Sequence, residues 1–211
     1  MARIGGRSTW LAVPAGLLCV AVVGALVYLA LPMVPVAVTW AGEALRAATA
    51  PRPIPTAGPT PAQLAAQGSA IDCRTLYPDE LWAELTWKGG ALLSQTKAPP
   101  ATEVTSLTDA LAPTPQVTCS WRLDTGGGIV TTLAGVADGA ADIADAALRA
   151  AGFSCGRDAG ALHCHRVRGD VIEEHTMRGG LWLSSIESVW HPEDYGARVE
   201  AHVWDMETTD G

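Results

Sequence analysis

The sequence predicts a two-layered α+β domain with an antiparallel meander sheet, one or two packed helices and two disulfides, preceded by one transmembrane helix. Three observations support this prediction. An uncharged apolar segment stands near the start, strand-like segments alternate with glycine turns in the second half, and four cysteines follow the apolar segment. Strands in one region with helices beside them are typical of α+β domains.

The apolar segment Trp10–Leu31 contains no charged residue. As a helix it is roughly 33 Å long, enough to cross a hydrocarbon core of about 30 Å. Arg3 and Arg7 precede it, and short basic flanks stay in the cytoplasm. We therefore expect residues 1–9 to be cytoplasmic and the C-terminal domain to be extracytoplasmic. Cleavage as a signal peptide stays an alternative, because a small-x-small site occurs at Ala48–Ala50.

Composition divides the rest of the chain. Residues 32–69 are rich in proline and alanine and poor in large apolar side chains, so we expect a semi-rigid linker there. Residues 70–207 are expected to form the extracytoplasmic α+β domain, and residues 208–211 a disordered tail. The length of the chain favours one domain after the anchor.

Helices are predicted at two main places in this domain. The first begins at Pro78, followed by Asp79 and Glu80, which suit the first turn of a helix, and it ends before a glycine. The second covers residues 139–151, where small apolar residues recur with helical spacing. One further helical turn is expected at residues 106–111.

Alternating segments bounded by glycine predict the strands. They are 91–97, 116–123, 129–136, 153–156, 161–168, 171–178, 181–190 and 197–205. Tight turns at 169–170 and 179–180 set the register of the later hairpins. That register places Cys164 opposite His175, on the same face of the sheet.

The four cysteines after the apolar segment predict two disulfides, because an even number in an exported domain is typical of disulfide pairing. Three connectivities are possible. We favour Cys155–Cys164, because these two residues flank one short turn, and Cys73–Cys119 then follows.

A zinc site is the alternative at His163-Cys164-His165, with Cys155 nearby. On a strand, however, His163 and His165 point away from Cys164, so these side chains do not converge. We therefore expect a disulfide there, with no metal and no other cofactor.

Common catalytic motifs are absent from the sequence, which has no Gly-x-Ser-x-Gly, His-Glu-x-x-His, Cys-x-x-Cys, Walker or Ser-x-x-Lys pattern. No catalytic residue is therefore assigned. Glu173 and Glu174 are neighbours on a predicted strand and point to opposite faces, so they do not form a cooperating acid pair. His175, near Cys164, is expected to be a partly buried histidine.

The loop from His191 to Tyr195 leaves one catalytic alternative open. Glu187, Glu193 and Asp194 can surround its histidine and tyrosine, which would suit a hydrolase. A polar connection between strands, with a proline and a glycine, is the simpler interpretation of the same residues.

Tryptophan is frequent in the predicted domain, and most of these rings must fill the core in place of phenylalanine. We expect one or two of them, Trp190 or Trp204, to be exposed. Together with His191 and Tyr195 they form the candidate binding surface.

The part of the chain after the apolar segment is acidic. Two of the 14 basic residues precede that segment, which leaves 12 basic against 22 acidic residues and a net charge of −10. This charge argues against nucleic acid and anionic lipid as partners. It favours either solubility alone or a basic partner.

Two short elements, Asp72-Cys73 and Cys119-Ser120-Trp121, carry a resemblance to known proteins. In them the chain resembles secreted or membrane-anchored actinobacterial extracytoplasmic domains of unknown function, which include lipoproteins and the sensor domains of receptor kinases. The resemblance implies an extracytoplasmic domain over residues 71–205 and supplies no catalytic residue. The chain departs from the lipoproteins by lacking their acylated cysteine, and from the kinases by the shortness of its cytoplasmic tail.

The function predicted from these observations is binding. We expect a single-pass membrane protein whose extracytoplasmic domain binds an unidentified protein or ligand of the cell envelope, and no nucleic acid. The short cytoplasmic tail is too small to hold a signalling module. Two alternatives stay open, an envelope hydrolase that uses the loop or the histidines, and a purely structural spacer.

Overall fold

A computed structural model of the protein describes residues 9–30 and 58–205, which belong to two separate units. The first contains helix α1 (Thr9–Ala30), and the side chains described along it are exposed. Among the described residues, no helix is long and apolar enough to span a membrane. The membrane crossing of Trp10–Leu31 stays a prediction. The predicted cytoplasmic tail, the first part of the linker and the predicted disordered tail lie almost entirely outside the described residues.

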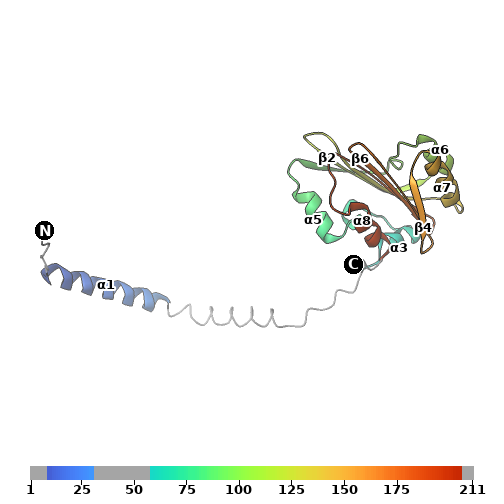
Figure 1. The fold of residues 1–211 in the computed structure, drawn as a ribbon. Coiled ribbons are helices and arrows are strands. Elements are labelled where there is room, and N and C mark those ends of the chain that lie inside the picture. Colours follow the sequence, from blue (N-terminus) through green and yellow to red (C-terminus); the bar gives the residue numbers. More distant parts are fainter. Residues whose placement is uncertain (1–8, 31–57, 206–211) are drawn as a thin grey trace. The chain divides into compact units, whose positions relative to one another are not determined.

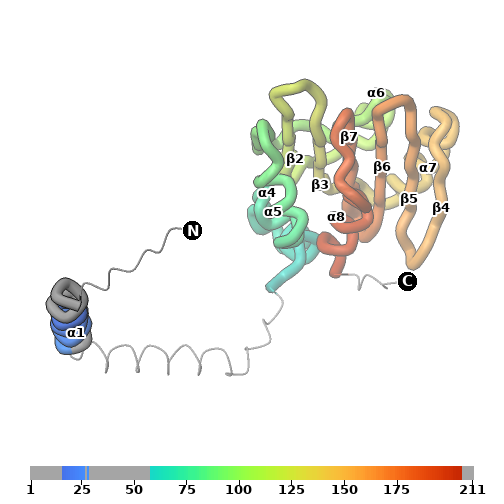
Figure 2. The backbone as a smooth tube through the Cα atoms, turned by 60° about the vertical axis from the view of Figure 1, so that its left-hand side comes forward, coloured from blue at the N-terminus to red at the C-terminus, as the bar shows by residue number. Residues whose placement is uncertain are grey.

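The second unit is built on an antiparallel sheet, which has seven strands within the described residues. The strands are β1 (Ala91–Thr96), β2 (Thr114–Leu123), β3 (Gly128–Gly135), β4 (Ser154–Asp158), β5 (Ala161–Arg168), β6 (Val171–Arg178) and β7 (Leu181–Ser188). Their order is β1-β2-β3-β7-β6-β5-β4, and Figure 2 shows this order from β2 to β4. The sheet therefore consists of two meanders, β1–β3 and β4–β7, which join where β3 pairs with β7.

Helices cover both faces of this sheet. They are α3 (Pro61–Ala66), α4 (Cys73–Leu76), α5 (Asp79–Trp87), α6 (Thr105–Leu111), α7 (Ala140–Ala150) and α8 (Tyr195–Trp204). Figure 1 shows α3, α5 and α8 on one side of the sheet and α6 and α7 on the other. The predicted α+β class is confirmed, but the domain has three layers where two were expected, because each face of the sheet carries a cluster of buried apolar residues.

The larger core lies between the sheet and the helices α3, α4, α5 and α8. Helix α8 contributes Tyr195, Val199 and Val203, which are almost fully buried. The disulfide Cys73–Cys119 joins α4 to β2 inside this core. Apolar burial and a covalent bond therefore fix the same helical layer to the sheet.

The second core lies between the opposite face and the helices α6 and α7. Helix α7 buries Ala140, Ala144 and Leu148, which recur every four residues as the sequence predicted. The disulfide Cys155–Cys164 joins β4 to β5 beside this core. Both predicted disulfides are present.

The predicted register of the later hairpins is confirmed. Cys164 of β5 lies opposite His175 of β6, as the two-residue turns required. In those turns Gly169 and Gly179 have φ angles of 59° and 58°, a left-handed conformation that glycine adopts at little cost.

The segment 197–205, predicted as a strand, forms most of helix α8 instead. Tyr195, Val199 and Val203 are buried and recur every four residues, which places them on one helical face. The alternation of Val199, Ala201 and Val203 with polar residues suggested a strand. Val199 and Val203 are four residues apart, and residues at that spacing share a face in a strand and in a helix alike. The helix forms because its apolar stripe completes the larger core.

The folded unit also begins before residue 70. Part of the predicted linker forms α3, which begins with a capping box. The Thr60 side chain accepts a hydrogen bond from the backbone N–H of Gln63, and the Gln63 side chain accepts one from the backbone N–H of Thr60. Its alanine and leucine side chains pack against the larger core. The prolines here suggested a linker, yet Pro61 occupies the first helical position, where proline is favourable.

Candidate functional site

A polar groove lies between α8 and the strands β5, β6 and β7. It consists of two adjoining hollows, a first of about 160 Å³ and a second of about 240 Å³. Glu174, Gly196 and Ala197 line both hollows, which shows that they share a wall. The two hollows together are called the polar groove below.

Strand alternation brings polar side chains from three strands into this groove. Every second residue of a strand points to the same face of the sheet. Strand β5 therefore contributes His163 and His165, β6 contributes Glu174, and β7 contributes Ser185 and Glu187. His165 lies opposite Glu174 in the register, and Glu174 lies opposite Ser185.

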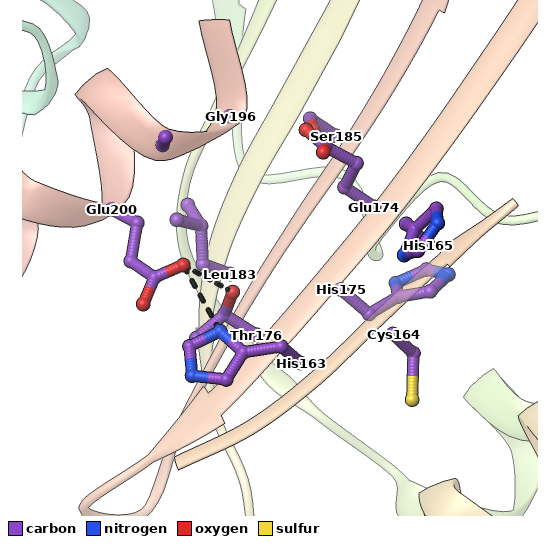
Figure 3. A pocket seen from close by; sticks show the side chains of 11 residues that line it. His163, Cys164, His165, Glu174, His175, Thr176, Leu183, Ser185, Gly196 and Glu200 are labelled. Carbon is purple, nitrogen blue, oxygen red and sulfur yellow. Dashed lines mark hydrogen bonds and ion pairs between the residues drawn. The ribbon is translucent and has the colours of Figure 1, made fainter. Parts of the chain in front are cut away.

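Helix α8 reaches the first hollow through Glu200. The Oε2 atom of Glu200 lies 3.2 Å from Nδ1 of His163 and accepts a hydrogen bond of 3.0 Å from Oγ1 of Thr176. Figure 3 shows Glu200 extending from the helix toward these two side chains. The carboxylate of Glu200 thus already has partners.

Glu187 is the most buried carboxyl group of the groove. Its side chain is only 4% exposed, yet it accepts no hydrogen bond from any residue that the structure describes. Nδ1 of His191 lies 3.6 Å from Oε2 of Glu187, which is too long for a hydrogen bond. Burial, with a contribution from the Glu174 carboxylate, raises the pKa of Glu187 from 4.5 to about 8.

Glu174 lies between the two hollows and shares these surroundings. Burial raises the pKa of Glu174, a nearby His165 opposes this shift and Glu200 adds to it. Gly196 leaves room for the carboxylate, since a Cβ at that position would overlap Oε2 of Glu174. Among the described residues, no lysine or arginine lines either hollow. The groove therefore concentrates carboxyl groups without a permanent cation.

The neighbouring residue Glu173 has the opposite surroundings. It points to the other face, is fully buried, and accepts hydrogen bonds of 2.6 Å from Oγ1 of Thr102 and 2.8 Å from Nη2 of Arg166. The backbone N–H of Glu103 donates to it as well. Burial raises the pKa of Glu173, but hydrogen bonds from His175 and Thr102 outweigh burial and hold that pKa below its ordinary value.

His175 belongs to this buried network on the second core. Nε1 of Trp182, which can only donate, donates to Nδ1 of His175 over 3.2 Å, so the ring proton is on Nε2. That proton is donated to Oε1 of Glu173, 3.0 Å away. The ring is fully buried where the sequence indicated partial burial, and both of its nitrogens are occupied. Its role is structural.

The four residues of the predicted binding surface lie in different places. His191 and Tyr195 line the second hollow of the groove. Trp190 is buried in the larger core. Trp204 is half-buried and lines a separate hollow beside α3. The groove therefore contains two of the four.

The loop that begins at His191 assembles only part of the arrangement expected for a hydrolase. Glu187 and Asp194 line the second hollow with His191, whereas Glu193 is not among its lining residues within the described chain. The hydroxyl of Tyr195 is hydrogen-bonded inside the core, and burial raises the pKa of Tyr195 well above its ordinary value. This hydroxyl stays protonated and faces away from solvent.

Metal-ligand geometry is not preformed in the groove. In the part of the chain that the structure describes, the group of three donor atoms within 4.8 Å of one another consists of Asp145, Cys155 and Cys164. Both cysteines belong to a disulfide, so neither is available as a thiolate ligand.

The sequence contained a signal for the groove that the prediction did not use. Polar residues occur at every second position on three consecutive predicted strands, which places them on one face. These pairs are His163 and His165, Glu174 and Thr176, and Ser185 and Glu187. Glu200, in contrast, required the correct assignment of α8.

No family model, curated protein or solved structure matches the chain. The resemblance to actinobacterial extracytoplasmic domains therefore stays a prediction. A fold alone does not define an activity, so the groove is the feature of this domain that bears on function.

Proposed function

We propose that the chain is a membrane-anchored extracytoplasmic protein of the cell envelope whose folded domain binds a cationic ligand in the polar groove. The observation that carries this proposal is Glu187, a carboxyl group with 4% of its side chain exposed and no hydrogen-bond donor among the described residues. It lines a hollow together with Glu174.

The energetics of the carboxyl groups favour a positive ligand. An ionised carboxylate that is buried without a hydrogen-bond donor is costly, so burial raises the pKa of Glu187 and favours its protonated form in the empty groove. A cation in the second hollow supplies the missing charge and allows Glu187 to ionise. An anion in the same place would meet the negative charge of Glu174 as well, which makes anion binding unfavourable.

Composition supports the proposed location. The segment Trp10–Leu31 is uncharged and follows basic residues, as in a single-pass anchor with a cytoplasmic N-terminus. The disulfides Cys73–Cys119 and Cys155–Cys164 are typical of proteins in oxidising compartments.

The groove favours binding over the spacer alternative. An apolar side chain in place of a buried carboxyl group that accepts no hydrogen bond is generally more stable, so a spacer gains nothing from Glu187. Perturbed carboxyl groups in a hollow are instead typical of functional sites.

Calorimetric titration of the full-length chain in detergent tests the proposed ligand class. At one ionic strength, the probes are divalent metal ions, aliphatic amines, inorganic phosphate and succinate. We expect saturable binding of at least one class of cation and none of the anions, with loss of binding in the double variant Glu174→Gln/Glu187→Gln.

A matched control is the double variant Glu80→Gln/Asp109→Asn, which makes two carboxyl-to-amide changes at exposed positions on α5 and α6. It should bind as the unmodified chain does. Failure of every cation to bind, or equal binding by the groove double variant, would contradict the proposal.

The proposed location has its own test. A reporter that is active only after export, fused after Gly211, should be active in cells. An inactive reporter in the cytoplasm would contradict both the anchor orientation and the envelope location.

A further inference from the structure

We infer that the ligand of the polar groove is a primary ammonium group on an aliphatic chain, which Glu187 and Glu174 hold in the second hollow. This inference rests on the proposed function and narrows the ligand from cations in general to one chemical class. It depends on the spacing of the donors, on the unused hydrogen-bonding capacity of two carboxyl groups, and on the walls of the hollow.

The spacing of the side chains disfavours a single first-row divalent metal ion. First-row divalent ions lie about 2.0–2.2 Å from oxygen or nitrogen ligands, so two ligands of one ion are at most about 4.4 Å apart. Among the described groove residues, no three histidine or carboxylate donor atoms lie within 4.8 Å of one another. An ammonium nitrogen tolerates wider spacing, because its acceptors lie about 2.8 Å away and as much as about 5.6 Å from each other.

The hydrogen-bonding capacity of the groove matches an ammonium group. Within the described residues, neither Glu174 nor Glu187 accepts a hydrogen bond, whereas Glu200 already accepts one from Thr176. A primary ammonium group carries three N–H donors and no acceptor. It therefore supplies donors and positive charge to two carboxyl groups that accept no hydrogen bond within the described residues.

The walls of the second hollow suit an aliphatic chain. Ile172, Pro192 and Tyr195 line it together with Glu174, Glu187, His191 and Asp194, and its volume is about 240 Å³. Apolar contacts beside convergent polar groups are usual in a small-ligand site. A chain of several methylenes can contact these walls while its ammonium group contacts Glu187.

Two probes of equal charge test the need for N–H donors. The full-length chain in detergent is titrated by calorimetry with n-butylammonium and with tetramethylammonium, which has no N–H group. We expect butylammonium to bind at least about tenfold more tightly, since charge-assisted hydrogen bonds exceed the 1.4 kcal/mol that a factor of ten requires.

A variant pair locates the binding. Glu187→Gln should weaken butylammonium binding by about tenfold or more, because it removes the charge and half of the acceptors of that side chain. Glu80→Gln, at an exposed position on α5, should leave the affinity unchanged. Circular dichroism of both variants verifies that each one is folded.

A further pair of probes distinguishes two sources of the ammonium group, a free amine and a lysine side chain of a partner protein. 1,5-Diaminopentane represents a free amine, and a blocked lysine peptide, compared with its Nε-acetylated form, represents a side chain of a partner protein. Tighter binding of the diamine supports a small-molecule ligand. Tighter binding of the lysine peptide, lost on acetylation, supports a protein partner.

Equal affinity for butylammonium and tetramethylammonium would overturn the inference, and so would an unchanged affinity in Glu187→Gln. Binding of Zn²⁺ alone, lost in Glu187→Gln, would overturn it but keep the proposed cation-binding function. If no cation binds at all, the proposed function fails as well.

Discussion

Glu173 and Glu174 are neighbours on β6, yet the two faces of the sheet give them opposite surroundings. On the face toward α6 and α7, Glu173 accepts hydrogen bonds from Arg166 and Thr102, and its pKa is lowered. On the face toward α8, Glu174 and Glu187 have no such donors among the described residues, and their pKa values are raised.

This difference distinguishes a stabilising role from a binding role for buried carboxyl groups. The Glu173 network joins β6, β5 and the segment before α6, so its charges hold elements of the fold together. Glu174 and Glu187 of the groove accept no hydrogen bond within the described residues, and their burial reduces stability in the empty protein. Groups of that kind persist where a ligand needs them.

The largest expected effect on stability is on the face toward α6 and α7, where Arg166 pairs with Glu173. Arg166→Ala leaves Glu173 buried without its cation and should lower the free energy of unfolding by about 3–5 kcal/mol. Guanidinium chloride unfolding of the full-length chain, followed by tryptophan fluorescence, measures this loss. Arg168→Ala is the matched control, because Arg168 is 65% exposed and its ion pair with Glu103 is screened by solvent. Equal losses in the two variants would contradict the structural role of the network.

The pH dependence of stability in Glu187→Gln tests the carboxyl groups on the opposite face, toward α8. Between pH 4.5, the ordinary pKa, and about 8, the folded carboxyl keeps its proton while the unfolded one loses it. Stability should therefore fall as pH rises through this window, with the unmodified chain losing about 4 kcal/mol relative to the Gln variant between pH 5 and pH 8.5. The Glu187 carboxyl faces Glu174 from β6, His191 and Asp194 from the loop, and Tyr195 from α8.

Urea unfolding of both proteins from pH 5 to 8.5 measures that difference. Glu80→Gln is the control for the loss of an exposed carboxyl and should follow the unmodified chain. Parallel pH curves for Glu187→Gln and the unmodified chain would show that this carboxyl group ionises normally.

The smallest effect on stability, with a clear effect on binding, is expected for Gly196→Ala. The new Cβ displaces the flexible Glu174 side chain, while alanine favours helix α8, so stability should change by less than about 1 kcal/mol. Affinity for butylammonium should fall, as calorimetry can measure. Gly156→Ala is the control, because a Cβ there meets no atom within 4 Å. Unchanged affinity in Gly196→Ala would argue against a ligand position between Glu174 and α8.

Local sequence features were sufficient to predict the disulfides, the register of the later hairpins and every predicted strand except 197–205. Turn lengths set that register, and once Cys164 lies opposite His175 the separation of Glu173 and Glu174 onto two faces follows from strand alternation. These features depend on residues close in sequence, which is why they could be predicted.

The groove depended on contacts between distant segments. The spacing of Val199 and Val203 fits a strand or a helix, and packing against the sheet decides for α8, which alone brings Glu200 to His163. Two donors for Glu173, the hydroxyl of Thr102 and the backbone N–H of Glu103, come from the segment before α6, which is 71 and 70 residues away. No local pattern indicates which of two adjacent glutamates receives them.

Nuclear magnetic resonance of the full-length chain with ¹³C-labelled glutamate carboxyl groups tests the central claim most directly. Single Glu→Gln variants assign the signals, and n-butylammonium is added to saturation. The carboxyl signals of Glu187 and Glu174 should shift while that of Glu173 stays in place. Stationary signals from Glu187 and Glu174 at saturating amine, or an equal shift of Glu173, would contradict a binding site confined to the face of the sheet toward α8.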